Sequence, residues 1–361
     1  MRTTSVLATA ALVGTAVLVA TPASAAPLVC GSTVTVSTSL TTDLTCTGPA
    51  PALTLGAGVT LNLKGHTVSG PGTGVGILVP QDGDVVIRNG TLTGWSAGVD
   101  TGGPVDEPRT GTVAVDRLTV TDSGTGVDAS GELPFSGGKA TTVTRSRFER
   151  VGTGIDASWF ADVWVSASTF SDATVGLRVD TSFADVSGST FRRNGTAIAA
   201  TEGAVDVHGS SFVDNTAGVR LFFMGAATVD ASTFRGNDVA VDAGGFVPQL
   251  VLTGNTFTTN TEAVELGDVD GTISSNVFRR NGSGVHGQST ATTSLVVQGN
   301  VLHRNGDAIV FDAADANTSL GGNTATRNSG WGIYAPGVTD LGGNAASGNG
   351  NSPQCVGVSC S

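Results

Sequence analysis

Apolar residues recur along the chain with a period close to 22 residues, rather than with the 3.6-residue period of an amphipathic helix. The clearest marker is a phenylalanine two positions after a serine or asparagine, and successive markers lie 21 to 24 residues apart. An apolar residue stands five positions before each marker, and from the third marker onward an asparagine stands three positions after it. The markers are Phe148, Phe170, Phe191, Phe212, Phe234, Phe257 and Phe278, continued by Leu302, Ala325 and Ala346. The pattern predicts internal repeats, so length alone does not set the number of domains.

The repeat unit is too short for a four-stranded propeller blade and lacks the leucine spacing of a leucine-rich repeat. Three short strands joined by tight turns fit it, because Val and Thr are abundant and helical periodicity is nearly absent after residue 25. Each strand then pairs in parallel with the same strand of the next coil, about 4.8 Å away. We therefore predict an all-β, single-stranded, right-handed parallel β-helix, a solenoid of about 12–13 coils of roughly 22 residues each.

Identical inward residues are expected to superimpose in such a stack, phenylalanine on phenylalanine and valine on valine. Asparagines repeated at one turn form hydrogen-bonded ladders, as stacked amides do in cross-β assemblies. The 52 glycines supply positive φ angles for the turns.

The two ends of the chain differ from the repeats. Residues 1–25 have a positive start, a short apolar stretch and a small-residue cleavage motif, which predicts a signal peptide and a secreted, extracellular protein. We expect a disulfide-pinned N-terminal cap at 26–60, the β-helix at 61–349 and a C-terminal disulfide tail at 350–361. Because the ends of a long stack are far apart, the four cysteines are expected to pair near each end, as Cys30–Cys46 and Cys355–Cys360.

The formal net charge is −12, and only two of the 18 cationic residues are lysines. A basic face for nucleic acid is absent, so we expect no nucleic-acid partner. No later segment is apolar for long enough to span a bilayer, so we expect no membrane contact after signal cleavage, and a monomer. The acidic balance favours solubility and leaves Ca²⁺ as a weaker cofactor hypothesis.

The opening coils carry a more specific signal. The segment 61–70, Leu-Asn-Leu-Lys-Gly-His-Thr-Val-Ser-Gly, is followed by Gly76-Ile77 and by the segment 85–92, Val-Val-Ile-Arg-Asn-Gly-Thr-Leu. These segments resemble the first coils of the right-handed parallel β-helix repeat proteins of the pectate-lyase-like superfamily, of the secreted bacterial type. The resemblance implies the fold, and it offers polysaccharide lyases, hydrolases, epimerases, adhesins and a copper-enzyme maturation family as functional models. No Met, His or Cys cluster suggests a copper site.

Outward residues of the middle coils supply the candidate chemistry. Alternation along a strand places Asp206 and His208 on one face, with Asp230 one coil away from His208. We predict these three as candidate catalytic residues, because a histidine beside aspartates can transfer protons. Aromatic and acidic residues nearby predict carbohydrate binding; they are Trp164, Asp185, Trp159 and Phe183. The competing interpretation is that acidic residues on an exposed sheet only prevent aggregation.

We therefore predict a secreted protein that binds or acts on an extracellular polysaccharide, lyase-like or epimerase-like if it is catalytic. The alternative is a non-catalytic surface module that binds carbohydrate or protein. Common hydrolase, zinc-protease and phosphate-loop motifs are absent from the sequence. Neither the paired-aspartate pattern of polygalacturonases nor the arginine motif of pectate lyases is found.

Overall fold

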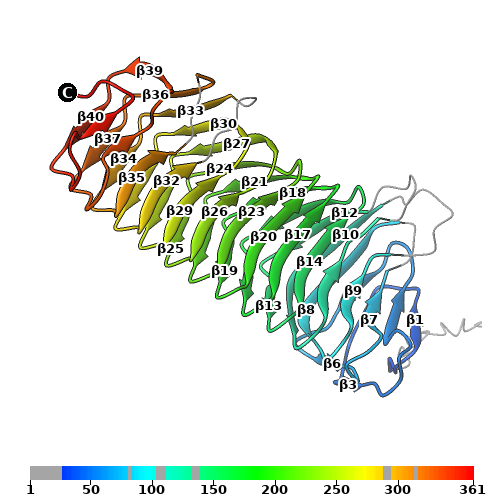
Figure 1. The fold of residues 1–361 in the computed structure, drawn as a ribbon. Helices are drawn as coiled ribbons and strands as arrows, with labels where there is room; N and C mark the ends of the chain where they lie inside the picture. Colours follow the sequence, from blue (N-terminus) through cyan, green and yellow to red (C-terminus); the bar gives the residue numbers. More distant parts are fainter. Residues whose placement is uncertain (1–26, 80–82, 103–110, 132–138, 288–293, 313–315) are drawn as a thin grey trace, which may run out of the picture.

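The computed structural model describes residues 27–79, 83–102, 111–131, 139–287, 294–312 and 316–361. In these residues the chain forms strands and turns without a helix, wound about one axis in about 14 turns (Figure 1). The expected signal peptide lies outside the described residues. Across the described ranges, no helix has the length and apolarity needed to cross a membrane.

Every turn contributes strands to three parallel columns, which follow one another in chain order. Column I is a 15-stranded sheet. Its strands are β1 (Ser32–Val34), β4 (Leu53–Leu55), β7 (Val75–Leu78), β9 (Ala97–Asp100), β11 (Thr125–Asp128), β14 (Thr153–Ser158), β17 (Val175–Asp180), β20 (Thr196–Thr201), β23 (Ala217–Phe222), β26 (Val239–Ala243), β29 (Glu262–Leu266), β32 (Ser283–Gly287), β35 (Asp307–Phe311), β38 (Ile333–Tyr334) and β41 (Cys355–Val356).

Column II follows column I within each turn, and two of its strands, β8 and β10, continue into column III. Its strands are β2 (Thr38–Ser39), β5 (Thr60–Asn62), β8 (Val85–Thr93), β10 (Thr112–Thr121), β12 (Ala140–Thr144), β15 (Asp162–Ser166), β18 (Phe183–Ser187), β21 (Ala204–His208), β24 (Ala226–Asp230), β27 (Val247–Thr253), β30 (Val269–Ser274), β33 (Leu295–Gln298), β36 (Thr318–Gly321) and β39 (Thr339–Gly342).

Column III completes the turn with short strands that carry the marker phenylalanines. Its strands are β3 (Leu44–Thr45), β6 (Thr67–Ser69), β13 (Arg147–Glu149), β16 (Thr169–Ser171), β19 (Thr190–Arg192), β22 (Ser211–Val213), β25 (Thr233–Arg235), β28 (Thr256–Thr258), β31 (Val277–Arg279), β34 (Val301–His303), β37 (Thr324–Thr326) and β40 (Ala345–Ser347).

The predicted phenylalanine column is confirmed. All seven rings are fully buried, and each stacks on the next with ring centroids between 4.5 and 5.2 Å apart. The register pairs Phe170 with Phe191 and Phe191 with Phe212, so the inward positions of successive turns superimpose. A continuous aromatic stack therefore forms one side of the core.

Two polar ladders run through the buried turns. In the ladder between columns III and I, Asn237 donates from its backbone N–H and its Nδ2 to Oδ1 of Asn260. In the ladder between columns II and III, serines occupy the earlier turns and asparagines take over from Asn255 onward. Each ladder satisfies backbone groups that would otherwise be buried without partners.

Both expected disulfides are present, Cys30–Cys46 and Cys355–Cys360. The count of about 14 turns exceeds the expected 12–13 because the first and last segments join the stack. Strand β1 pairs in parallel with β4, and β41 pairs in parallel with β38. The segment expected as a cap therefore contributes paired strands of its own.

Candidate functional site

The outer face of column II carries the candidate catalytic residues. Register pairs Trp164 with Asp185 and Asp185 with Asp206, on the neighbouring strands β15, β18 and β21. His208, two residues after Asp206 on β21, pairs with Asp230 on β24. Alternating burial along these strands turns all five residues outward, while valines between them fill the core. The structure thus brings these five predicted residues together on one surface.

His208 and Asp230 form a hydrogen-bonded pair, with 2.8 Å between Nδ1 and Oδ1. Each side chain is 44% exposed. The hydrogen bond from Asp230 raises the pKa of His208, and the negative charges of Asp230, Asp185 and Asp206 raise it further against the effect of burial. The imidazolium form is therefore favoured, and Nδ1–H donates to the carboxylate.

This pair gives a prediction about pH. Asp230→Asn should lower the pKa of His208, measured by NMR titration of the imidazole, because it removes the hydrogen bond to a charged partner. Asp206→Asn, the control, should lower that pKa less, since Asp206 acts only through its charge. An equal shift in both variants would contradict the specific role of the hydrogen bond.

The same shift links His208 to stability. Because its folded-state pKa is raised, its contribution is fully present below the unfolded pKa of about 6.5 and is lost as pH rises through the folded pKa. Solvent exposure of both side chains limits that contribution to below about 1 kcal/mol.

An aromatic corner borders this face, where each turn passes from column I to column II. Its exposed side chains are Trp159, Phe160, Phe222, Phe223, Met224 and Phe246. Trp159 and Phe160 occupy consecutive left-handed conformations, with φ of 58° and 60°, and Phe223 and Met224 repeat this at 37° and 57°. Bulky residues adopt this conformation at an energetic cost, and such outliers often mark functional positions.

A hollow of about 560 Å³ lies on the column II side of the aromatic corner. Phe160, Phe183 and Met224 supply its apolar lining, and Asp162 and Glu202 add carboxylates. Phe183 lies two residues before Asp185 on β18, so the hollow continues into the predicted outer face. Phe183 therefore contacts the same surface as the candidate catalytic residues.

Trp159 points to a different place than the sequence suggests. It lines a second cavity, of about 700 Å³, on column I. Asp100, Asp128 and Asp156 stack in register along that cavity. Burial raises the pKa of Asp156, against the lowering effects of the Ser158 hydroxyl and of Arg178, whose Nη1 lies 3.3 Å from Oδ2 of Asp156.

The sequence contains a signal for this acidic cavity. Gly98-Val99-Asp100 recurs as Gly126-Val127-Asp128 and as Gly154-Ile155-Asp156, at intervals of 28 residues. These aspartates follow an inward branched residue, so alternation turns them outward in successive turns. In the described ranges of the chain, no group of three or more His, Cys, Asp or Glu side chains is arranged to hold a metal ion.

Comparison with known proteins follows from this geometry. The family model described as "Right handed beta helix region" matches residues 53–239 and 175–349. No curated protein sequence is significantly similar to the chain. Two solved structures are similar in fold. A mannuronic acid-specific polysaccharide family 6 lyase from the human gut microbiota has 10% identity and a TM-score of 0.41, covering 81% of this chain and 83% of its own. The A-module of a mannuronan C-5 epimerase from Azotobacter vinelandii has 16% identity and a TM-score of 0.40, covering 91% of each chain.

The family match covers most of the chain and agrees with the parallel stacking of all three columns. The predicted right-handed parallel β-helix is thereby confirmed. The chain belongs to the family of right-handed β-helix proteins.

Proposed function

We propose that the protein binds an extracellular polysaccharide along the aromatic corner and the adjoining outer face of column II. The observation that carries the proposal is the set of exposed aromatic side chains at successive corners, next to a hollow lined by both rings and carboxylates. An exposed apolar patch rimmed by polar groups is typical of a binding surface. The proposal places the protein outside the cell as a monomer, and its two disulfides suit an oxidising compartment.

A sugar chain matches this combination of groups. The apolar faces of sugar rings pack on aromatic rings such as Phe160, Phe183 and Trp164, and sugar hydroxyls donate to carboxylates such as Asp162 and Glu202. The solenoid repeats its surface about every 4.8 Å. A polymer that lies along the axis therefore meets equivalent positions on several turns.

The charges of this surface favour a neutral polysaccharide. Asp162, Asp185, Asp206 and Glu202 lie on or beside the hollow, in a chain with a net charge of −12. Their field repels a carboxylated polymer, whereas a neutral polymer gains hydrogen bonds from the same carboxylates. We therefore expect a neutral glycan at this site.

Retention on insoluble polysaccharides tests the proposal. Trp164→Ala and Phe183→Ala should each weaken binding to a neutral polysaccharide by about tenfold, because each removes an aromatic contact. Leu341→Ala is the matched control, since Leu341 is also exposed, at 53%, on β39 of the same column at the far end. Equal binding of all three variants, or no retention of the native protein on neutral polysaccharides, would contradict the proposal.

The His208–Asp230 pair favours catalysis on the bound polysaccharide as a second candidate function. A histidine with a raised pKa is a proton donor at neutral pH rather than a base. In this proposal His208 donates a proton, Asp230 orients the ring and Asp206 faces the substrate. His208→Gln should then abolish product formation while retention on the polysaccharide persists. Product formation that is unaffected by this substitution would exclude His208 as the donor.

A further inference from the structure

The turn between columns III and I holds one residue in the left-handed conformation in nearly every coil. From β10 to β25 the charges at this position alternate in sign, and the residues are Asp122, Arg150, Asp172, Arg193 and Asp214. Arg150 lies 2.8 Å from Asp122, and Arg193 lies 2.6 Å from Asp172. The N-terminal half of this edge is therefore a ladder of neutralised ion pairs.

The C-terminal half of the same edge lacks this neutralisation. After Gly236 and Thr259, the next three turns place Arg280, Arg304 and Arg327 at the left-handed position. Adjacent turns lie about 4.8 Å apart, so like charges are neighbours. Ion pairs among the described residues involve other arginines, on the earlier turns. An anion from outside the chain would relieve this repulsion.

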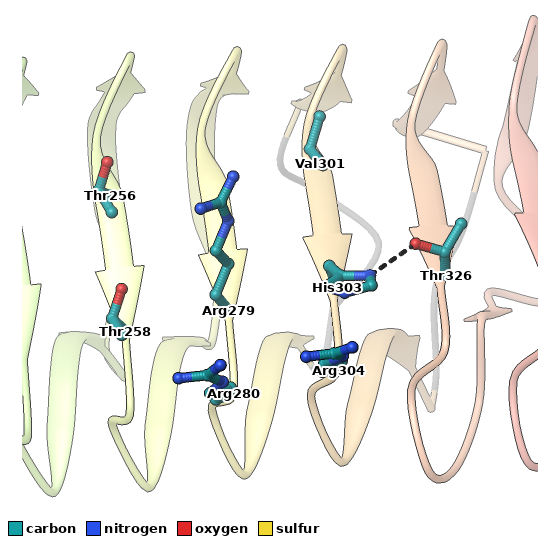
Figure 2. Close-up of a pocket in the computed structure, with 8 residues that line it drawn as sticks. All are labelled: Thr256, Thr258, Arg279, Arg280, Val301, His303, Arg304 and Thr326. Atoms are coloured by element: carbon teal, nitrogen blue, oxygen red, sulfur yellow. Dashed lines mark hydrogen bonds between the residues drawn. The ribbon is translucent and has the colours of Figure 1, made fainter.

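Two outward residues of column III extend the cluster. Arg279 on β31 is paired in register with His303 on β34, directly before Arg280 and Arg304. Figure 2 shows Arg279 projecting from its strand above Arg280, with His303 above Arg304 on the next turn. His303 Nδ1 lies 3.0 Å from the Thr326 hydroxyl. Three guanidinium groups and one imidazole thus share one surface.

These side chains line a cavity of about 540 Å³. Its remaining lining is neutral, with hydroxyls from Thr256, Thr258 and Thr326 and an apolar surface from Val301, which is 40% exposed. Guanidinium groups bind carboxylates through paired hydrogen bonds. Threonine hydroxyls suit sugar hydroxyls, and an exposed valine suits the apolar face of a sugar ring. A bare inorganic anion would use only the cations.

We propose that this arginine cluster is a second glycan site, specific for a carboxylated saccharide of the uronate type. Successive Arg280 and Arg304 positions suit carboxylates on a polymer that runs along the axis. The site lies on column III and its following turn, apart from the aromatic corner between columns I and II, so it does not depend on the function proposed above.

Titration calorimetry of the purified protein tests this site with three probes: an oligogalacturonate, a neutral galacto-oligosaccharide of the same length, and inorganic sulfate. The oligogalacturonate should bind at least about tenfold more tightly than either other probe, and its affinity should fall as salt concentration rises. The double variant Arg280→Gln/Arg304→Gln should bind it about a hundredfold more weakly, because two charge-assisted contacts are lost.

Arg193→Gln is the matched control. It removes an arginine from the same left-handed position in a turn where Asp172 already neutralises it, so affinity should remain within about twofold. Thermal unfolding of each variant verifies the fold. Unchanged affinity in the double variant, absence of oligogalacturonate binding, or displacement by equimolar sulfate would each overturn the proposal. Retention on neutral polysaccharide is a separate readout, so failure of one site is distinguishable from failure of the other.

Discussion

Phe212→Ala is expected to lower the free energy of unfolding by about 3–5 kcal/mol, as large-to-small substitutions of buried aromatic residues do. The Phe212 ring is fully buried, with centroids 5.2 Å from Phe191 and 4.5 Å from Phe234. Turns on both sides are fixed by parallel hydrogen bonding, so the cavity left by the ring cannot collapse. Stacking with both neighbours is lost in addition to the buried area.

Denaturant unfolding followed by circular dichroism measures this effect. Phe212→Leu is the matched control and should cost less than half as much, because Leu302 already occupies the same column position, paired with Phe278. A loss below about 1 kcal/mol for Phe212→Ala would contradict a continuous aromatic stack.

Asn260→Ala is expected to lower the free energy of unfolding by about 2–4 kcal/mol, because it leaves buried polar groups without partners. Oδ1 of Asn260 accepts from the backbone N–H and from Nδ2 of Asn237, both at 2.9 Å. Nδ2 of Asn260 donates to the Phe234 carbonyl at 3.1 Å and to Oδ1 of Asn281 at 3.0 Å. Asn260 is 2% exposed, so water does not replace these bonds.

Two measurements separate this effect from a general loss of packing. Hydrogen exchange at the Asn237 amide should accelerate in Asn260→Ala, because its acceptor is removed. Thr258→Ala, an outward-facing neighbour on β28, is the control and should change stability by less than about 1 kcal/mol. Normal protection of the Asn237 amide in the asparagine variant would contradict the ladder.

The sequence is sufficient to predict the core and the winding. Phe191, Asn194 and Val186 each face inward, where shape and hydrogen bonding leave little choice, so the same residue types recur in every turn. Stacking of identical residues fixes the register, which in turn fixes the outward neighbours. That is why the placement of Asp206, His208 and Asp230 on one face is predictable.

Residues at the corners are harder to predict, because a tight turn separates neighbours in the sequence. Trp159 and Phe160 are adjacent, yet Trp159 lines the acidic cavity on column I and Phe160 lines the hollow on column II. Their consecutive left-handed conformations direct the two side chains apart. The aspartates beside Trp159 are outward residues of an otherwise ordinary strand, and only their register reveals a shared cavity.

Distances between spin labels along column III test the single-axis stack most directly. Thr169, Thr256, Val301 and Ala345 hold equivalent outward positions on β16, β28, β34 and β40. Labels on cysteines introduced at Thr169 and at each later position should lie about 20, 30 and 40 Å apart, since four, six and eight turns separate them. Distances that stop growing with the number of turns would show that these strands do not follow one axis.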